Sequence, residues 1–193
     1  MEHYAAEVVR RYRQAKPHGV AYYQVLNEPI YTNYALPREF GYTLADYLRL
    51  LEHASGAMKA ADPDCRIVGG ISANLRADLT TGFVTEGGLR SVDVVDLHLY
   101  DPPRPVATYE EPLRSFADLM RTHGGPKPVW ITEWGCYADD DPPCVPPTVG
   151  DETMNRCRWA SERAATEHIV KFAAVSFAYE PGQWALREID FAA

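Results

Sequence analysis

The sequence lacks the marks of a membrane, nucleic-acid-binding or zinc-binding protein. It has no apolar run near the roughly 20 residues of a transmembrane helix, so no membrane partner is expected. Its 19 Lys and Arg residues are scattered and outnumbered by 27 Asp and Glu residues, which disfavours a nucleic-acid partner. The four cysteines form no C-x-x-C pair, so we expect no structural zinc site.

Two further signals are missing. No G-x-G-x-x-G turn occurs, which disfavours a dinucleotide site, and we expect no cofactor. The first residues, Met-Glu-His-Tyr, lack the basic and apolar segments of a signal peptide. The sequence does not identify the cellular compartment, and a longer parent enzyme can still be secreted.

The proline-rich segment 135–150 leaves two questions about side chains. Cys136 and Cys144 flank a loop rich in Pro and Asp, and they form a disulfide if the protein is secreted or stay as thiols if it is not. The run Asp139–Asp141 is interpreted as a solvated loop tip rather than a calcium site, because the following prolines restrict wrapping around an ion.

What the sequence does contain is an alternation of strand and helix patterns along 193 residues, with no linker or repeat dividing 1–193. Such alternation predicts βαβ units, a parallel sheet and a single α/β domain. We expect strands at 20–26, 66–70, 92–99, 128–132 and 171–179. We expect helices at 3–15, 44–58, 75–88, 113–120 and 151–169.

Polar and aromatic side chains gather where three of these strands end. The three segments are Val25–Pro29, Asp96–Tyr100 and Trp130–Gly135. In parallel α/β folds the carboxyl edge of the sheet is where ligands bind and catalysis occurs. We therefore expect the chemistry of this protein at that edge.

Two carboxylates, Glu28 and Glu133, each end an otherwise apolar strand. A protonated carboxyl can donate to a glycosidic oxygen, while an ionised one can attack the anomeric carbon. Retention of configuration needs the two groups roughly 5–5.5 Å apart and inversion about 6.5–9.5 Å. We predict that Glu28 and Glu133 are catalytic.

The same segments resemble motifs of clan A glycoside hydrolases. Gln24–Pro29 resembles their Asn-Glu-Pro motif at the end of the fourth barrel strand, and Trp130–Gly135 is similar to the end of the seventh. Asp96–Tyr100 is similar to the His-x-Tyr of the sixth strand. Asp62–Gly70 resembles the start of the fifth strand in families 39 and 5.

The resemblance implies a fold and a set of roles. The fold is a partial (β/α)8 TIM barrel, about strands four to eight with their helices, in a single N-terminally truncated catalytic domain over 1–193. Glu28 is implied to be the acid/base and Glu133 the nucleophile, with Tyr100 bonded to the nucleophile. The implied substrate-binding residues are Asn27, His98, Tyr100 and Trp134.

Each of these residues also has a plainer interpretation. Glu28 and Glu133 can be surface carboxylates, and Asn27 can start an Asx-turn. His98 can be a core histidine, and a metal there is disfavoured because no second ligand lies at a suitable spacing. Tyr100 and Trp134 can either contact a sugar or pack against the protein. The same holds for Trp184, for which the resemblance is weakest. The same choice applies to Tyr31, Tyr34 and Tyr42 in the loop after Glu28.

We therefore predict a retaining glycoside hydrolase that cleaves a β-linked glycoside or polysaccharide by double displacement, with a carbohydrate as its partner. The alternatives are a noncatalytic carbohydrate-binding or pseudoenzyme domain, or an α/β domain with no role in sugar chemistry. A complete barrel needs about 250 residues. We expect the isolated chain to be weakly stable and to have little activity, because an open barrel exposes strand edges and apolar surface. The sequence leaves the sugar and the oligomeric state open.

Overall fold

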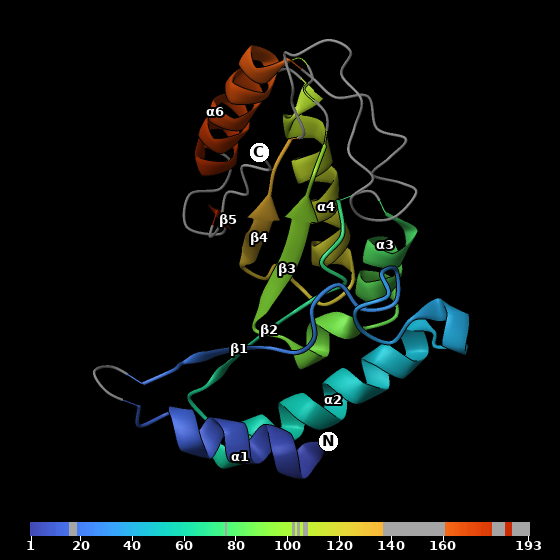
Figure 1. Cartoon of the computed structure of the whole chain (residues 1–193), viewed down its shortest axis with the longest axis vertical. Helices are drawn as coiled ribbons and strands as arrows, with labels where there is room; N and C mark the ends of the chain where they lie inside the picture. The colour runs from blue at the N-terminus through green and yellow to red at the C-terminus, as the bar shows by residue number, and fades with distance from the viewer. Residues whose placement is uncertain are drawn as a thin grey trace.

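The computed structural model describes residues 1–15, 19–75, 77–101, 103, 105, 108–136, 161–178 and 184–186. In these ranges five strands form one parallel sheet in the order β1-β2-β3-β4-β5 (Figure 1). The strands are β1 (Tyr22–Gln24), β2 (Arg66–Gly69), β3 (Val94–Leu99), β4 (Val129–Trp134) and β5 (Trp184–Leu186). The helices are α1 (Glu2–Tyr12), α2 (Leu44–Ala61), α3 (Asp78–Thr85), α4 (Glu110–Thr122) and α6 (Glu162–Ala178), with 3-10 turns η1 (Arg38–Phe40) and η2 (Gly88–Ser91).

Helix α2 shows how local sequence fixes an element and ties it to the sheet. A capping box starts the helix, because the backbone N–H of Thr43 donates to the Asp46 carboxylate at 2.9 Å. Tyr47 begins its buried stripe, and the Tyr47 hydroxyl donates to the carbonyl of Val25 at 3.3 Å. The same hydroxyl accepts the N–H of Gly70 at 3.4 Å. Helix α2 thereby holds the ends of β1 and β2 together.

One face of the sheet, called here the outer face, carries the hydrophobic core. Alternate residues of β3 and β4 point to it and are buried: Val95, Leu97, Leu99, Val129 and Ile131. They share one core cluster with apolar residues of α2 and α4, and α4 lies behind β3 and β4 in Figure 1. A curled parallel sheet with helices on its outer face is the partial (β/α)8 barrel that the sequence predicts.

The opposite face, called here the inner face, is polar and aromatic. It carries Asp96 and His98 of β3, and the amide of Gln24 on β1 reaches Asp96 across the sheet at 3.0 Å. The rings of Tyr22 on β1 and Trp130 on β4 also meet there, with centroids 4.7 Å apart. The inner face therefore carries polar and aromatic groups, and the outer face provides the burial that holds the strands.

The predicted strand at 171–179 is wrong. Residues up to Ala178 belong to α6, and the last strand is β5 at Trp184–Leu186. The buried positions of α6 are Ala165, His168, Phe172 and Ser176, which recur every three to four residues as on a helix. Because this stretch is apolar overall, its helical period is easily mistaken for a buried strand.

Several other expectations fall on residues outside the described ranges. They concern the first ten residues of the predicted 151–169 helix, Cys144 and Cys157, the run Asp139–Asp141 and the side chain of Trp184. The remaining helices and strands are confirmed to within a few residues at their ends. None of the helices in the described ranges combines the length and apolarity of a transmembrane span.

Candidate active site

Glu28 is presented by an irregular turn that follows β1. Leu26, Glu28 and Ile30 all have positive φ values, of 66°, 44° and 78°. Side chains with a Cβ avoid this region, so the turn is held by its surroundings. Ile30 is buried, and its N–H donates to the carbonyl of Ala35 at 2.9 Å. The hydroxyl of Thr32 donates to the carbonyl of Glu28 at 2.7 Å. These contacts fix the backbone from which the Glu28 carboxylate projects.

Glu133 reaches the inner face because of an irregularity in strand pairing. Leu97 pairs with Ile131, but the next residue of β3, His98, pairs with Glu133. Strand β4 thus carries one extra residue, Thr132, at this point. As a result Thr132 and Glu133 both contact inner-face groups, whereas strict alternation would turn one of them outward.

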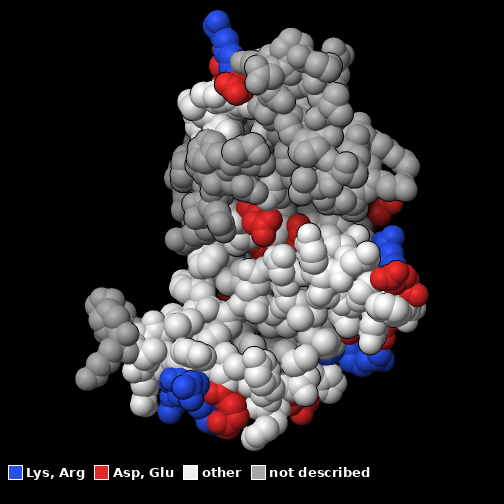
Figure 2. Space-filling model, in the orientation of Figure 1, with Lys and Arg blue, Asp and Glu red and all other residues white. Residues whose placement is uncertain are grey.

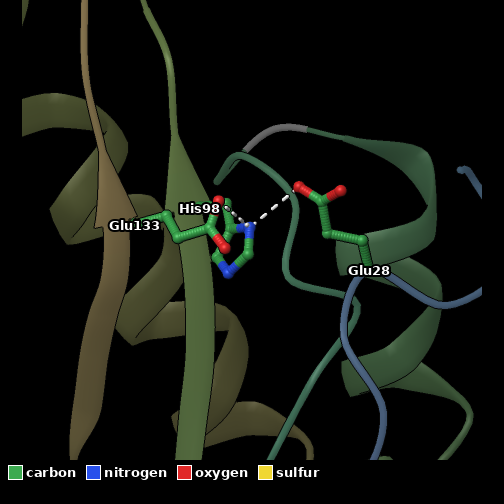
Figure 3. A group of neighbouring side chains, drawn as sticks. All are labelled: Glu28, His98 and Glu133. Atoms are coloured by element: carbon green, nitrogen blue, oxygen red, sulfur yellow. Dashed lines mark hydrogen bonds and ion pairs between the residues drawn. The ribbon is translucent and has the colours of Figure 1, made fainter. Parts of the chain in front are cut away.

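The two predicted carboxylates lie on either side of His98 (Figure 3). Nδ1 of His98 is 2.9 Å from Oε1 of Glu28 and 3.2 Å from Oε2 of Glu133. One ligand atom from each of the three residues lies within 4.8 Å of the others. The side chain of His98 is only 2% exposed, and Glu133 is the most open of the three at 33%.

Two tyrosines contact the carboxylates. The hydroxyl of Tyr100 donates to Oε2 of Glu133 at 3.0 Å. The hydroxyl of Tyr31 lies 2.9 Å from Oε1 of Glu28 and 2.6 Å from the carbonyl oxygen of Ser72. Burial, and next the charge of Glu28, raise the pKa of Tyr31 far above its usual value, so the phenol stays protonated.

A fully buried carboxylate, Asp96, lies beneath the site. It accepts hydrogen bonds from the hydroxyls of Ser72 and Thr132 and from the amide of Gln24. Burial raises the pKa of Asp96, and the hydrogen bonds from the two hydroxyls offset only part of that rise. Its Oδ2 is 4.0 Å from Nε2 of His98. Through these contacts Asp96, on β3, connects β1, the segment after β2 and β4, and it lies directly beneath His98.

The surroundings of His98 favour its protonated, positively charged form. Burial by itself lowers its pKa, but the hydrogen bond with Glu28 and the charges of Asp96 and Glu133 outweigh burial. The net effect raises the pKa of His98 above its ordinary value. A cation between two carboxylates reduces their mutual repulsion and allows both to occupy a small space.

The remaining predicted residues are placed as follows. Asn27 is exposed on the turn next to Glu28. Trp134 is 1% exposed and packs against Phe172 of α6, with ring centroids 4.8 Å apart, and against His168 at 5.8 Å. This burial fits the packing role that the sequence left as the alternative for Trp134. Tyr34 is 76% exposed and Tyr42 is 43% exposed.

The sequence missed the supporting groups. Asp96, Ser72 and Thr132 form hydrogen bonds between residues that are 24 and 36 positions apart, so no local pattern marks them. The only available signal was the polar Asp96 inside an apolar strand. A metal at His98 was disfavoured on spacing along the chain, yet the fold brings Glu28 and Glu133 to it, and these three residues could hold a metal ion.

In the space-filling view, acidic side chains reach the surface near the centre of one face (Figure 2). The Lys and Arg side chains visible on this face lie toward its periphery. The formal net charge of the whole chain is −8. Such a surface disfavours anionic ligands and accepts neutral ones.

No family model and no curated protein sequence matches the chain. Solved structures do match its fold. A glucosidase from Croceicoccus marinus aligns with a TM-score of 0.67 at 15% identity, covering 100% of this chain and 37% of that one. A family 39 glycoside hydrolase from Bacteroides cellulosilyticus WH2 aligns at 0.59 and 14% identity, covering 98% and 36%.

A third match is a monomeric β-xylosidase from Caulobacter crescentus CB15, with a TM-score of 0.54 and 19% identity. It covers 69% of this chain and 30% of that one. The chain thus spans about a third of the length of these proteins. At such low identity the likeness concerns the fold. The chain shares the partial (β/α)8-barrel fold of these solved glycoside hydrolases.

Proposed function

We propose that this chain carries the catalytic residues of a retaining glycoside hydrolase that acts on a β-linked glycoside. One observation carries the proposal: carboxylate oxygens of Glu28 and Glu133 lie within 4.8 Å of each other at the carboxyl edge of the sheet. Retaining enzymes hold their two carboxyl groups roughly 5–5.5 Å apart, whereas inverting enzymes need about 6.5–9.5 Å to admit a water. The close pair supports direct attack by one carboxylate.

The surroundings of the two carboxylates support different roles. Glu133 accepts a hydrogen bond from Tyr100 and faces the cationic His98, and both contacts favour its ionised form. Glu133 is therefore the nucleophile. One of its oxygens bonds to the anomeric carbon while the bond from that carbon to the leaving oxygen breaks. Glu28 transfers its proton to the leaving oxygen.

The second step reverses the proton transfer. Glu28, now ionised, takes a proton from a water, and the water oxygen bonds to the anomeric carbon. The bond between that carbon and Glu133 breaks, so Glu133 regains its charge and Glu28 regains its proton. Two displacements at one carbon leave the anomeric configuration unchanged, and the cycle needs no cofactor.

A neutral carbohydrate suits the groups around the carboxylates. Asn27 is exposed beside Glu28, and we assign its amide to a sugar hydroxyl next to the reacting carbon. Trp134 supports the site from the core rather than by stacking on substrate, because it is buried against α6. The solved structures with the same fold include proteins described as a glucosidase and a β-xylosidase.

We expect the turnover number of this chain on its own to be low. The chain covers 37% or less of the three solved proteins described above. Sugar-contacting loops in (β/α)8 barrels come from all eight strand ends, and five strands supply only part of them. Weak binding of the non-reacting part of the substrate lowers the rate of the chemical step.

The test is the stereochemistry of the first product. A panel of aryl β-glycosides is incubated with the chain, and proton NMR follows the anomeric signal before mutarotation. We expect the β-anomer first, loss of hydrolysis in Glu28→Gln for substrates with poor leaving groups, and normal rates in Glu39→Gln, which alters an exposed residue of η1. Initial release of the α-anomer would contradict the proposal. Sugar binding without hydrolysis would favour a carbohydrate-binding domain instead.

A further inference from the structure

The group formed by Glu28, His98 and Glu133 has a feature that the proposed cycle does not use. Two carboxylate oxygens converge on one ring nitrogen, because Nδ1 of His98 is 2.9 Å from Glu28 and 3.2 Å from Glu133 (Figure 3). A protonated Nδ1 carries one hydrogen, which cannot be directed fully at two acceptors. Within the described part of the chain, this is the only group of three His, Cys, Asp or Glu side chains that converges in this way. A single cation between the three atoms contacts all of them at once.

The separations resemble those of ligand atoms around a small divalent ion. Zinc binds imidazole nitrogen and carboxylate oxygen at about 2.0–2.2 Å, which places neighbouring ligand atoms roughly 3.0–3.5 Å apart. The two distances from Nδ1 of His98 lie at or near this range. The oxygens of Glu28 and Glu133 lie within 4.8 Å of each other, and rotation of the Glu133 side chain, which is 33% exposed, brings them closer.

Contacts behind the three side chains orient them as in metal sites. A ligating histidine usually presents its other ring nitrogen to a carboxylate or carbonyl, and ligating carboxylates accept further hydrogen bonds. Nε2 of His98 faces the buried Asp96, whose Oδ2 is 4.0 Å away, so a small tilt of the ring brings the two atoms within hydrogen-bond distance. The hydroxyl of Tyr100 donates to Oε2 of Glu133, the oxygen that faces the histidine. The ligand atoms are therefore held in place from behind.

Charge and ligand type select the class of ion. Two ionised carboxylates and a neutral imidazole balance the charge of a divalent cation, which takes the place of the hydrogen on Nδ1 of His98. One nitrogen and two oxygens suit zinc and the neighbouring transition metals. Magnesium and calcium prefer oxygen ligands throughout, so the histidine disfavours them. The net charge of −8 on the chain attracts cations of any kind.

We propose that Glu28, His98 and Glu133 form a binding site for a divalent ion of the zinc class, and that the bound ion blocks hydrolysis. The ion coordinates the oxygens that the proposed cycle uses, so Glu133 cannot attack the sugar carbon and Glu28 cannot transfer a proton. The blocking part of this inference rests on the proposed function. The binding part rests on the geometry of the three side chains alone.

Calorimetric titration of the chain with zinc chloride at about pH 7 measures binding without turnover. Loss of the groups that support a ligand typically costs 10–100-fold in metal affinity, and loss of a ligand costs at least as much. We therefore expect the Kd for zinc to rise by roughly tenfold or more in Glu133→Gln, and Glu28→Gln serves if that variant does not fold. His53→Gln is the matched control, because it removes an exposed histidine that lies 2.6 Å from Glu2, and it should leave the Kd unchanged.

Hydrolysis of an aryl β-glycoside in the presence of zinc tests the blocking part. We expect the apparent KM to rise with zinc concentration while kcat stays constant, since ion and substrate compete for the same oxygens. The inference is overturned if zinc binding persists in both glutamine variants, if His53→Gln weakens it equally, or if saturating zinc leaves hydrolysis unchanged. Zinc binding by a chain that hydrolyses no glycoside keeps the metal site and removes the proposed function, whereas hydrolysis without zinc binding does the reverse.

Discussion

The two faces of the sheet are built by the same strands, yet they follow different physical rules. On the outer face, residues such as Leu97 and Ile131 are buried among apolar side chains of the helices. On the inner face, Asp96 and His98 are equally buried, but each has directional polar contacts. Apolar burial tolerates small changes of geometry, whereas a buried charge needs partners at defined positions.

We expect stability to depend mainly on the outer face and activity on the inner face. The outer face gains free energy from area removed from water, so its residues are expected to matter for folding. The inner face holds three acidic side chains close to one histidine, an arrangement that is useful for catalysis and costly for stability. Substitutions on the two faces should therefore separate activity from stability.

The largest effect on activity is expected from the inner face. Glu133→Gln removes the proposed nucleophile with almost no change of shape, and we expect hydrolysis of an aryl β-glycoside to fall by roughly 10³-fold or more. The melting temperature should fall little or rise, because a partly buried charge is removed. Glu52→Gln, an exposed change on α2, is the matched control. If Glu133→Gln lost stability as severely as activity, the inner face would be needed for folding as well as for catalysis, which would contradict the expectation.

The largest effect on stability is expected from the outer face. Leu97→Ala removes a fully buried side chain from β3, and we expect the free energy of unfolding to fall by about 2–5 kcal/mol. Val170→Ala, at a 64% exposed position on α6, should change it by less than about 0.5 kcal/mol. Denaturant titration monitored by circular dichroism measures both. A small effect at Leu97 would show that the core is elsewhere.

Asp96 belongs to the inner face, but its hydrogen bonds to neighbouring strands support the structure of the sheet. Asp96→Asn keeps the shape and weakens the hydrogen bonds with Ser72 and Thr132. We expect a loss of about 1–3 kcal/mol in the free energy of unfolding at pH 5. Asp64→Ala, which alters an exposed aspartate, should have little effect.

The loss caused by Asp96→Asn should depend on pH. The folded-state pKa values of Asp96 and His98 are both raised, so the stability from their bound protons is present at low pH and is lost as pH rises through those values. Asparagine does not titrate, and its presence lowers the pKa of His98. The difference between wild type and variant should therefore shrink from pH 5 to pH 8. A difference that grows with pH would contradict the directions given for these two groups.

A smaller effect is expected from Tyr100→Phe. Its hydroxyl donates one hydrogen bond to Glu133 at the open side of the site, and the ring remains in place. We expect kcat/KM to fall by roughly tenfold, with a stability change below about 1 kcal/mol. Tyr42→Phe, at a 43% exposed loop position, is the control. A loss as large as that of Glu133→Gln would mean that Tyr100 takes a direct part in the reaction.

The sequence predicted the outer face and four of the five strands because those follow local periodicity. Apolar alternation marks β3 and β4, and the Thr43 and Asp46 pair marks the start of α2. It failed at α6, where Ala- and Val-rich sequence fits a buried strand as well as a helix, and only the spacing of buried residues in the folded protein separates the two.

Residue types at strand ends selected Glu28, His98 and Glu133 as site candidates. The fold brings these three side chains together, and their roles in catalysis and binding stay predictions. The inner-face network was not predictable, because the pairing irregularity at Thr132 and the contacts of Asp96 depend on the register between strands. Trp134 illustrates the limit most clearly. It follows Glu133 directly in sequence, but strand alternation turns it to the core.

The proposed function requires Glu133 to form a covalent bond with the sugar carbon. The most direct measurement uses a 2-deoxy-2-fluoro β-glycoside with an activated leaving group, which slows the second step and traps the intermediate, followed by mass spectrometry of peptides. We expect one fluorosugar adduct on the peptide that contains Glu133, and no adduct in Glu133→Gln. Hydrolysis of glycosides without any adduct, or an adduct on Glu28 instead, would contradict it.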